Sequence, residues 1–235
     1  MENFTPLSEF EALASQTGIS LPPLLKNLLA FGKTAYGSDW SATWRERMLA
    51  GGPAFICWYD FEWLDAADAR REVGEWLNPE AQDGKRFLPF AQSGAGDAYC
   101  LMPVDENSVG VALIFHDRET SRMIHRSFED FVIAGYLECF ANLDHLADDD
   151  FSEDEILQCL KADVHGVTAL MTEKQGAYLR SLCEQELAKR EFHPGPKARP
   201  EHVLSLISQE QLEKELAAVP MPDLAPFSIT AAWEL

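Results

Sequence analysis

Residues 86–142 read RFLPFAQSGAGDAYCLMPVDENSVGVALIFHDRETSRMIHRSFEDFVIAGYLECFAN, and this stretch decides the fold. Apolar runs rich in aromatic and β-branched residues, separated by short loops of small or polar residues, are typical of consecutive antiparallel strands. The pattern predicts three strands, over 87–91, 98–104 and 109–115, joined by the loops SGAGD and DENS.

A helix is expected directly after this meander. Ser127 is a suitable N-cap, and Asp130 places a carboxylate in the first turn, where the helix dipole favours negative charge. Apolar residues then recur at intervals of three and four up to Ala141. An antiparallel sheet covered by a helix predicts the α+β fold class.

The segments before the meander also show helical patterns. Helix-entry residues precede apolar residues at helical spacing, and Asp65 is a further N-cap. We expect helices over 5–17, 24–31, 40–50 and 66–77, and a short strand over 54–58.

The run 148–155, DDDFSEDE, indicates a boundary between elements. Capping-box spacings begin at Ser152, Thr172 and Ser208, and they predict helices that end near residues 160, 192 and 219. A short helical piece is expected over 201–207, and the tail 227–233 is either a terminal strand or a docked extended arm. The expected organisation is an α+β domain over 1–147 and a helical, acidic extension over 148–235.

Composition is that of a globular protein. The chain has 235 residues, of which 46% are apolar and 25% charged. Apolar runs stay well short of the roughly 18 residues that a membrane span needs, and MENFTPLSEF has neither a basic start nor an apolar signal core. We therefore expect a cytoplasmic protein that does not bind membranes.

The five cysteines are scattered and form no CxxC pair. Their neighbours are apolar, as in FICWY around Cys57 and AYCLM around Cys100. This context favours buried thiols in a reducing compartment over a disulfide framework or a metal site.

Net charge is the most informative property of the composition. The chain carries 19 basic and 39 acidic residues, which gives a formal charge of −20. Such a surface repels phosphates, so direct nucleic-acid binding is disfavoured. The charge suits solubility, or rapid capture of a basic protein partner.

Histidines are the main candidates for chemistry. His116 and Asp117 end the third predicted strand, and His125 follows nine residues later. A histidine beside an acid is a possible base or half a metal site, but neighbouring residues in a strand point to opposite faces and no further acid cluster completes the set. The SGAGD loop lacks a phosphate-binding pattern. We expect no catalytic residue, no metal and no cofactor.

Several motifs occur in a familiar order: LP to LL over 21–29, FLPFA over 87–91, GDAYCL over 96–101, GV with HD over 110–117, and SFEDF over 127–131. Over about residues 8–145 this order resembles the SUKH superfamily, which contains the yeast Smi/Knr cell-wall regulators and many bacterial immunity proteins. The segment from residue 148 onward resembles no family that we can name.

The resemblance implies an α+β domain with a curved sheet and no catalytic site. Bacterial members of the superfamily bind and neutralise toxin domains, often nucleases or deaminases, so the resemblance implies a bacterial immunity protein with a basic toxin as its partner. Asp97 and Tyr99 are expected to build the turn and strand of the fold. The partner-binding candidates are exposed acidic groups at strand ends and loops, namely Asp60, Glu62, Asp105, Glu106, Asp117 and Glu119.

Two other functions are compatible with the sequence. One is an intracellular adaptor or regulatory module that uses the C-terminal third as a second interaction surface. The other is an enzyme that uses His116 or His125.

Overall fold

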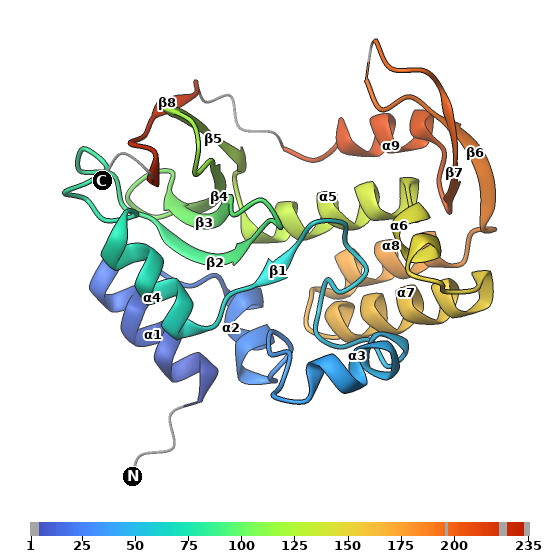
Figure 1. Ribbon diagram of the computed structural model, residues 1–235, viewed down its shortest axis with the longest axis horizontal. Helices are drawn as coiled ribbons and strands as arrows, with labels where there is room; N and C mark the ends of the chain where they lie inside the picture. The colour runs from blue at the N-terminus through green and yellow to red at the C-terminus, as the bar shows by residue number, and fades with distance from the viewer. Residues whose placement is uncertain (1–4, 196, 221–224, 233–235) are drawn as a thin grey trace. The chain divides into compact units, whose positions relative to one another are not determined.

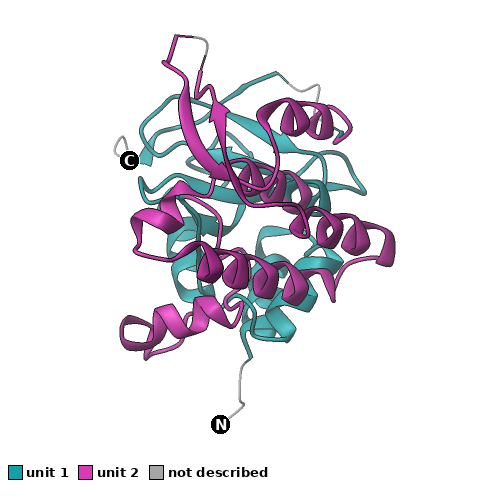
Figure 2. Cartoon of the chain, turned by 90° about the vertical axis from the view of Figure 1, so that its right-hand side faces the viewer, with its two compact units in different colours: residues 1–35, 60–131, 220–235 teal, residues 36–59, 132–219 magenta. Residues whose placement is uncertain are grey.

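The computed structural model describes residues 5–195, 197–220 and 225–232 (Figure 1). The chain divides into two compact units, each built from segments far apart in sequence (Figure 2). Unit 1 comprises residues 1–35, 60–131 and 220–235, and unit 2 comprises residues 36–59 and 132–219. The boundary expected after residue 147 lies inside unit 2, and an independent domain over 1–147 stays a prediction.

Unit 1 contains a six-stranded antiparallel sheet with the strand order β1-β2-β3-β4-β5-β8. The predicted α+β class and the three predicted strands are confirmed. Register irregularities in the β2–β3 and β4–β5 pairs are of the kind that bends strands. The strands are β1 (Glu62–Trp63), β2 (Leu88–Gln92), β3 (Ala98–Pro103), β4 (Val109–Ile114), β5 (Thr120–His125) and β8 (Phe227–Ser228).

The last two strands of this sheet add to the predicted meander. β5 was not among the predicted strands, although its odd and even positions differ in burial, with Thr120 and Arg122 exposed and Ser121 and Met123 buried. β8 pairs with β5, which confirms the terminal-strand alternative for this part of the tail. The strand is short, and the tail beyond residue 232 lies outside the described residues.

Helices cover the sheet of unit 1 as the capping residues predict. α1 (Pro6–Thr17) and α4 (Ala66–Glu75) lie side by side and both contact β2 (Figure 1). The Asp65 carboxylate caps α4 by accepting two backbone N–H bonds, each 2.8 Å long. α2 (Pro23–Ala30) is the second N-terminal helix, and α5 (Phe128–Ala141) begins in unit 1 directly after the meander.

Aromatic rings fill the space between the sheet and the start of α5. Phe90 of β2 lies 5.4 Å from Phe128 and 5.7 Å from Phe131, measured between ring centroids. All three side chains are buried. Edge-on contacts of this kind add to the stabilisation that comes from burying apolar area, so they fix α5 on the sheet.

Unit 2 is mainly helical, with one hairpin. The predicted N-caps Ser152, Thr172 and Ser208 each accept a backbone N–H bond from the residue three positions on. Its elements are α3 (Trp40–Leu49), the later part of α5, α6 (Asp144–Asp148), α7 (Glu153–Thr168), α8 (Glu173–Cys183), β6 (Ala188–Phe192), β7 (Glu201–Ser205) and α9 (Gln209–Leu216).

Three predictions about helices of unit 2 are wrong. The helix expected to end near residue 160 continues to Thr168. The helix expected up to residue 192 ends at Cys183, and the helix expected over 201–207 is strand β7. β6 and β7 pair with each other from Ala188↔Ser205 to Phe192↔Glu201. The proline- and glycine-bearing link between them turns the chain back, so their backbone groups bond across the hairpin instead of along a helix.

The strand expected over 54–58 is also wrong, because this segment is a turn. Phe55 adopts φ 64°, a left-handed conformation that no strand contains. The carboxylate of Asp163, fully buried in α7, accepts a 3.0 Å bond from the Phe55 backbone N–H. A buried acid on a distant helix therefore replaces the strand partner that this apolar run lacks.

All five cysteines are buried free thiols, which confirms their predicted burial. Among the residues that the structure describes, no helix combines the length and the apolar character required to cross a membrane.

Candidate protein-binding site

Because the strands of unit 1 are antiparallel, the loops between them lie at two opposite ends of the sheet. Successive loops of a meander alternate between the ends, so the β2–β3 loop (93–97) and the β4–β5 turn (115–119) share one end. The β3–β4 loop (104–108) lies at the other. The six predicted partner-binding residues are all exposed, as expected, but they divide between these ends.

Asp60 and Glu62 lie at the same end as the β2–β3 loop. The Asp60 carboxylate accepts a 2.6 Å bond from the backbone N–H of Gly94, and the Glu62 carboxylate accepts a 3.1 Å bond from the side chain of Gln92. The register Glu62↔Gln92 fixes this position, because β1 begins where β2 ends. These two acids therefore face the loop across the sheet edge.

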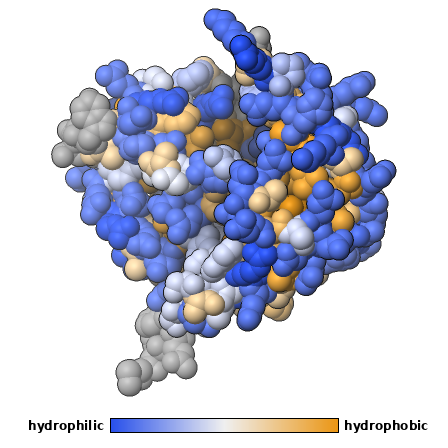
Figure 3. All heavy atoms as spheres, turned by 45° about the vertical axis from the view of Figure 1, so that its right-hand side comes forward, coloured by the Kyte–Doolittle hydropathy of each residue, from blue (hydrophilic) through white to orange (hydrophobic). Residues whose placement is uncertain are grey.

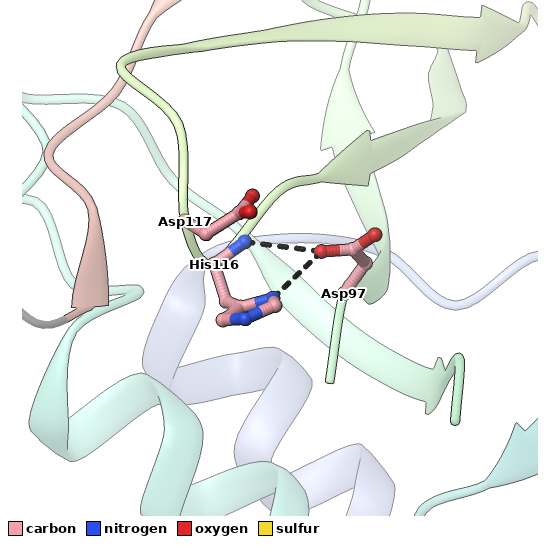
Figure 4. A group of neighbouring side chains, drawn as sticks. All are labelled: Asp97, His116 and Asp117. Atoms are coloured by element: carbon pink, nitrogen blue, oxygen red, sulfur yellow. Dashed lines mark hydrogen bonds and ion pairs between the residues drawn. The ribbon is translucent and has the colours of Figure 1, made fainter. Parts of the chain in front are cut away.

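Asp97 is a further acidic residue at this end, for which the sequence predicted only a structural role in the turn. Its carboxylate lies beside His116, where Oδ1 accepts a 3.2 Å bond from the backbone N–H and lies 2.8 Å from Nδ1 (Figure 4). The side chain of Asp97 is 18% exposed. Asp97 thus holds the turn, as predicted, and also brings a carboxylate to the HD pair.

Asp117 completes this cluster at the turn after β4. One possible ligand atom from each of Asp97, His116 and Asp117 lies within 4.8 Å of the other two. The Asp117 carboxylate also lies 3.6 Å from the Nε atom of Arg118, whose guanidinium covers the Phe115 ring. The sequence alone did not place Asp97 beside the HD pair, whereas the β3–β4 register Ala98↔Ile114 does.

We define the acidic end of the sheet as Asp60, Glu62, Asp97, Asp117 and Glu119. Glu119 precedes β5 and is exposed, and its backbone carbonyl accepts a 2.9 Å bond from the N–H of Ile229. Five acidic residues thus lie at one end of the sheet, on three separate chain segments. The electrostatic potential of such an end is negative and attracts basic surfaces.

Asp105 and Glu106 lie at the opposite end of the sheet. The Asp105 carboxylate accepts bonds from the Ser108 hydroxyl at 2.6 Å and from the Asn107 N–H at 2.8 Å. These bonds, the hydroxyl bond first, lower the pKa of Asp105 below its ordinary value. Asp105 therefore stabilises its own turn.

The two candidate histidines are not brought together. His125 pairs with Val111 in the β4–β5 register, whereas His116 follows the other end of β4. Five residues of extended chain, at about 3.3 Å per residue, separate those positions by roughly 16 Å. His125 is buried, and burial lowers its pKa to about 4. A site that uses both histidines is therefore not present.

Unit 2 carries its own acidic segment. Asp148, Asp149, Asp150, Glu153 and Asp154 are all exposed around the start of α7. The nearby Arg45 side chain bonds the Glu155 carboxylate at 3.0 Å and lies 4.2 Å from the centre of the Phe151 ring. Figure 3 shows one face of the molecule, where hydrophilic side chains dominate and smaller apolar patches lie between them.

The order of the chain from α1 to α5 matches a known family. A family model described as the SMI1 / KNR4 family (SUKH-1) matches residues 6–134, more than half of the chain. The chain belongs to the SUKH family. The match includes all of the acidic end, and residues 135–235 lie beyond it. Comparison with curated proteins and with solved structures gives no match.

Proposed function

We propose that this SUKH-family protein is a bacterial immunity protein, which neutralises a toxin by binding it and catalyses no reaction itself. Family membership supports the proposal, because the SUKH resemblance implies toxin neutralisation by protein–protein binding. The formal charge of −20 supports it independently. Toxins that act on nucleic acids need basic surfaces to hold phosphates, and an acidic protein can occupy such surfaces.

The observation that carries the proposal is the gathering of Asp60, Glu62, Asp97, Asp117 and Glu119 at one end of the sheet. A basic toxin attracted to this end would approach quickly and in a defined orientation, because complementary charge raises association rates. The proposed interface is therefore the acidic end, and Asp105 and Glu106 are outside it.

The test compares charge reversals at the two ends of the sheet. The probe is the C-terminal domain of a toxin, chosen by whether a large secreted protein with a basic C-terminal module is encoded beside this chain, and binding is measured by calorimetry at 50 and 500 mM salt. Asp117→Lys with Glu119→Lys is expected to weaken binding at least tenfold at low salt. The matched control, Asp105→Lys with Glu106→Lys, changes the total charge equally and should weaken binding less than threefold.

Two results would reject parts of this proposal. Equal losses for the two double variants would remove the acidic end as the interface. Failure of the wild-type chain to bind the toxin domain, or to protect cells that express it, would remove the immunity function.

An adaptor or regulatory role is the second candidate, and one observation favours it. Unit 2 lies largely beyond the residues that match the family, and it carries the exposed acidic segment around residues 148–154. An adaptor would bind several partners through this segment. Binding that survives Asp117→Lys with Glu119→Lys but is lost on neutralising residues 148–154 would support the adaptor.

A further inference from the structure

We propose that Asp97, His116 and Asp117 form a binding site for a divalent transition-metal ion, of which Zn²⁺ is the best fit. This inference is independent of the proposed function, because it concerns the chain without a partner. The site contains one imidazole and two carboxylates, contributed by the β2–β3 loop and the β4–β5 turn (Figure 4).

The distances between the three groups suit such an ion. Zinc–nitrogen and zinc–oxygen bonds are about 2.0–2.2 Å long, so ligand atoms around a tetrahedral ion lie about 3.4 Å apart. Here the Nδ1 atom of His116 lies 2.8 Å from Oδ1 of Asp97, and the set lies within 4.8 Å. Rotation of the Asp117 side chain, which is 57% exposed, can close the remaining gap.

Hydrogen bonds of the β2–β3 loop hold Asp97, the less exposed of the two carboxylates, in place. The backbone N–H of Asp97 donates a 3.1 Å bond to the Ser93 hydroxyl, and the Ser93 N–H donates a 2.9 Å bond to the Asp97 carbonyl. The Asp97 carboxylate is further fixed by the His116 backbone N–H. Ligands that are already fixed lose little entropy on binding, which favours affinity.

The chemistry of the ligand set selects the class of ion. Imidazole nitrogen favours Zn²⁺ and its neighbours in the first transition series, whereas Ca²⁺ and Mg²⁺ prefer oxygen ligands alone. Two carboxylates beside a neutral imidazole balance the charge of a divalent ion. An ion held by Nδ1 would require the neutral ring, with its proton on Nε2.

Arg118 is the competing cation. Its Nε atom lies 3.6 Å from the Asp117 carboxylate, and its side chain is 61% exposed. An exposed ion pair of this kind contributes little to stability, so Arg118 can leave the carboxylate to the metal at small cost. Three protein ligands leave at least one coordination position for water or for a group from another molecule.

The test uses the full chain after treatment with EDTA, titrated with ZnCl₂ or MnCl₂ alone by calorimetry. We expect one saturable Zn²⁺ site, with weaker binding of Mn²⁺ and none of Ca²⁺ at equal concentration. The His116 ring nitrogens should shift in NMR spectra on addition of Zn²⁺, whereas those of His125 should not.

Variants locate the site. His116→Gln and Asp117→Asn should each weaken Zn²⁺ binding at least tenfold, and both positions are accessible enough to change without disturbing the core. The matched controls Glu119→Gln and Glu106→Gln also remove one exposed carboxylate each and should change affinity less than twofold. Circular dichroism checks that each variant is folded.

Three results would overturn the inference. They are the absence of saturable binding up to 1 mM Zn²⁺, losses of affinity in the control variants equal to those at the site, and an affinity for Zn²⁺ that His116→Gln leaves unchanged. The first two would reject the site, and the third would assign the ion to other residues. All three are read without a toxin, so they are separate from the outcome of the immunity test.

Discussion

Mild acid should destabilise unit 1 through His125. Burial lowers the pKa of this imidazole from 6.5 to about 4, and its Nδ1 atom has no hydrogen-bond partner. The nearby Asp130 carboxylate acts in the opposite direction but more weakly. The folded protein therefore keeps His125 neutral under conditions where the unfolded chain protonates it.

The sign and size of the effect follow from these two pKa values. Between about pH 6.5 and pH 4 the unfolded state binds a proton that the folded state does not, so stability falls as the pH falls. A pKa difference of about 2.5 units corresponds to about 3 kcal/mol when the pH reaches 4. The contribution is fully present above pH 6.5.

The assay is urea unfolding at pH 7, 6, 5 and 4.5, comparing wild type with His125→Leu. Leucine has a similar size and cannot be protonated, and it removes a buried polar atom that lacks a partner. Between pH 7 and 4.5 the free energy of unfolding of the variant should therefore fall by about 2 kcal/mol less than that of wild type. His193→Gln, at an exposed histidine of the β6–β7 hairpin, is the control and should follow wild type.

The comparison also separates His125 from other groups. Burial lowers the pKa of His145 in unit 2 as well, so wild-type stability falls with acid for a second reason. Both proteins contain His145, and their difference reports His125 alone. The reasoning would be refuted if the His125 ring titrated near pH 6.5 in NMR spectra of the folded protein, or if the variant showed the wild-type pH dependence.

Three further predictions concern packing and burial. Gly135→Ala should destabilise the protein by about 1–3 kcal/mol in thermal unfolding, because the added Cβ would clash with the Trp58 ring. Gly74→Ala is the matched control: its Cβ would meet no atom within 4 Å, so the better helix former should stabilise α4 by about 0.5–1 kcal/mol. Asp163→Ala should lower the free energy of unfolding in urea by about 2 kcal/mol or more, because it removes the acceptor of the buried Phe55 N–H. Asp163→Asn should lower it less, because an acceptor oxygen remains. The cysteines, all buried, should react with a thiol reagent at pH 8 only when urea opens the fold, and rapid labelling of the native protein would contradict their burial.

Local signals in the sequence predicted much of the fold. The caps at Asp65, Ser152 and Thr172 were predictable because an N-cap contacts backbone only two or three residues away. The β2–β3–β4 meander was predictable because its loops are short. β5 was missed because TSRMIH mixes polar residues into both faces of a strand, so alternation is hard to see in the sequence.

Errors occurred where a residue distant in sequence decides the local structure. The 54–58 segment is apolar enough for a strand, but the carboxylate of Asp163 bonds its backbone in a turn. The residues of β6 fit a helix pattern, but they pair with β7 residues that lie nine to seventeen positions further along the chain. Hydrogen bonds across such distances depend on the folded path of the chain, which periodicity does not report.

The sequence by itself determined the family, the antiparallel core and the large negative charge, because motif order, strand spacing and composition can all be read along the chain without knowing how it folds. Only the tertiary structure decided which acids lie together. The register between β3 and β4 brings Asp97 to His116 and Asp117, nineteen and twenty residues away, and the direction of the loops sends Asp105 and Glu106 to the opposite end. A site made of side chains from separate strands exists only once the backbone hydrogen bonds of the sheet have set that register.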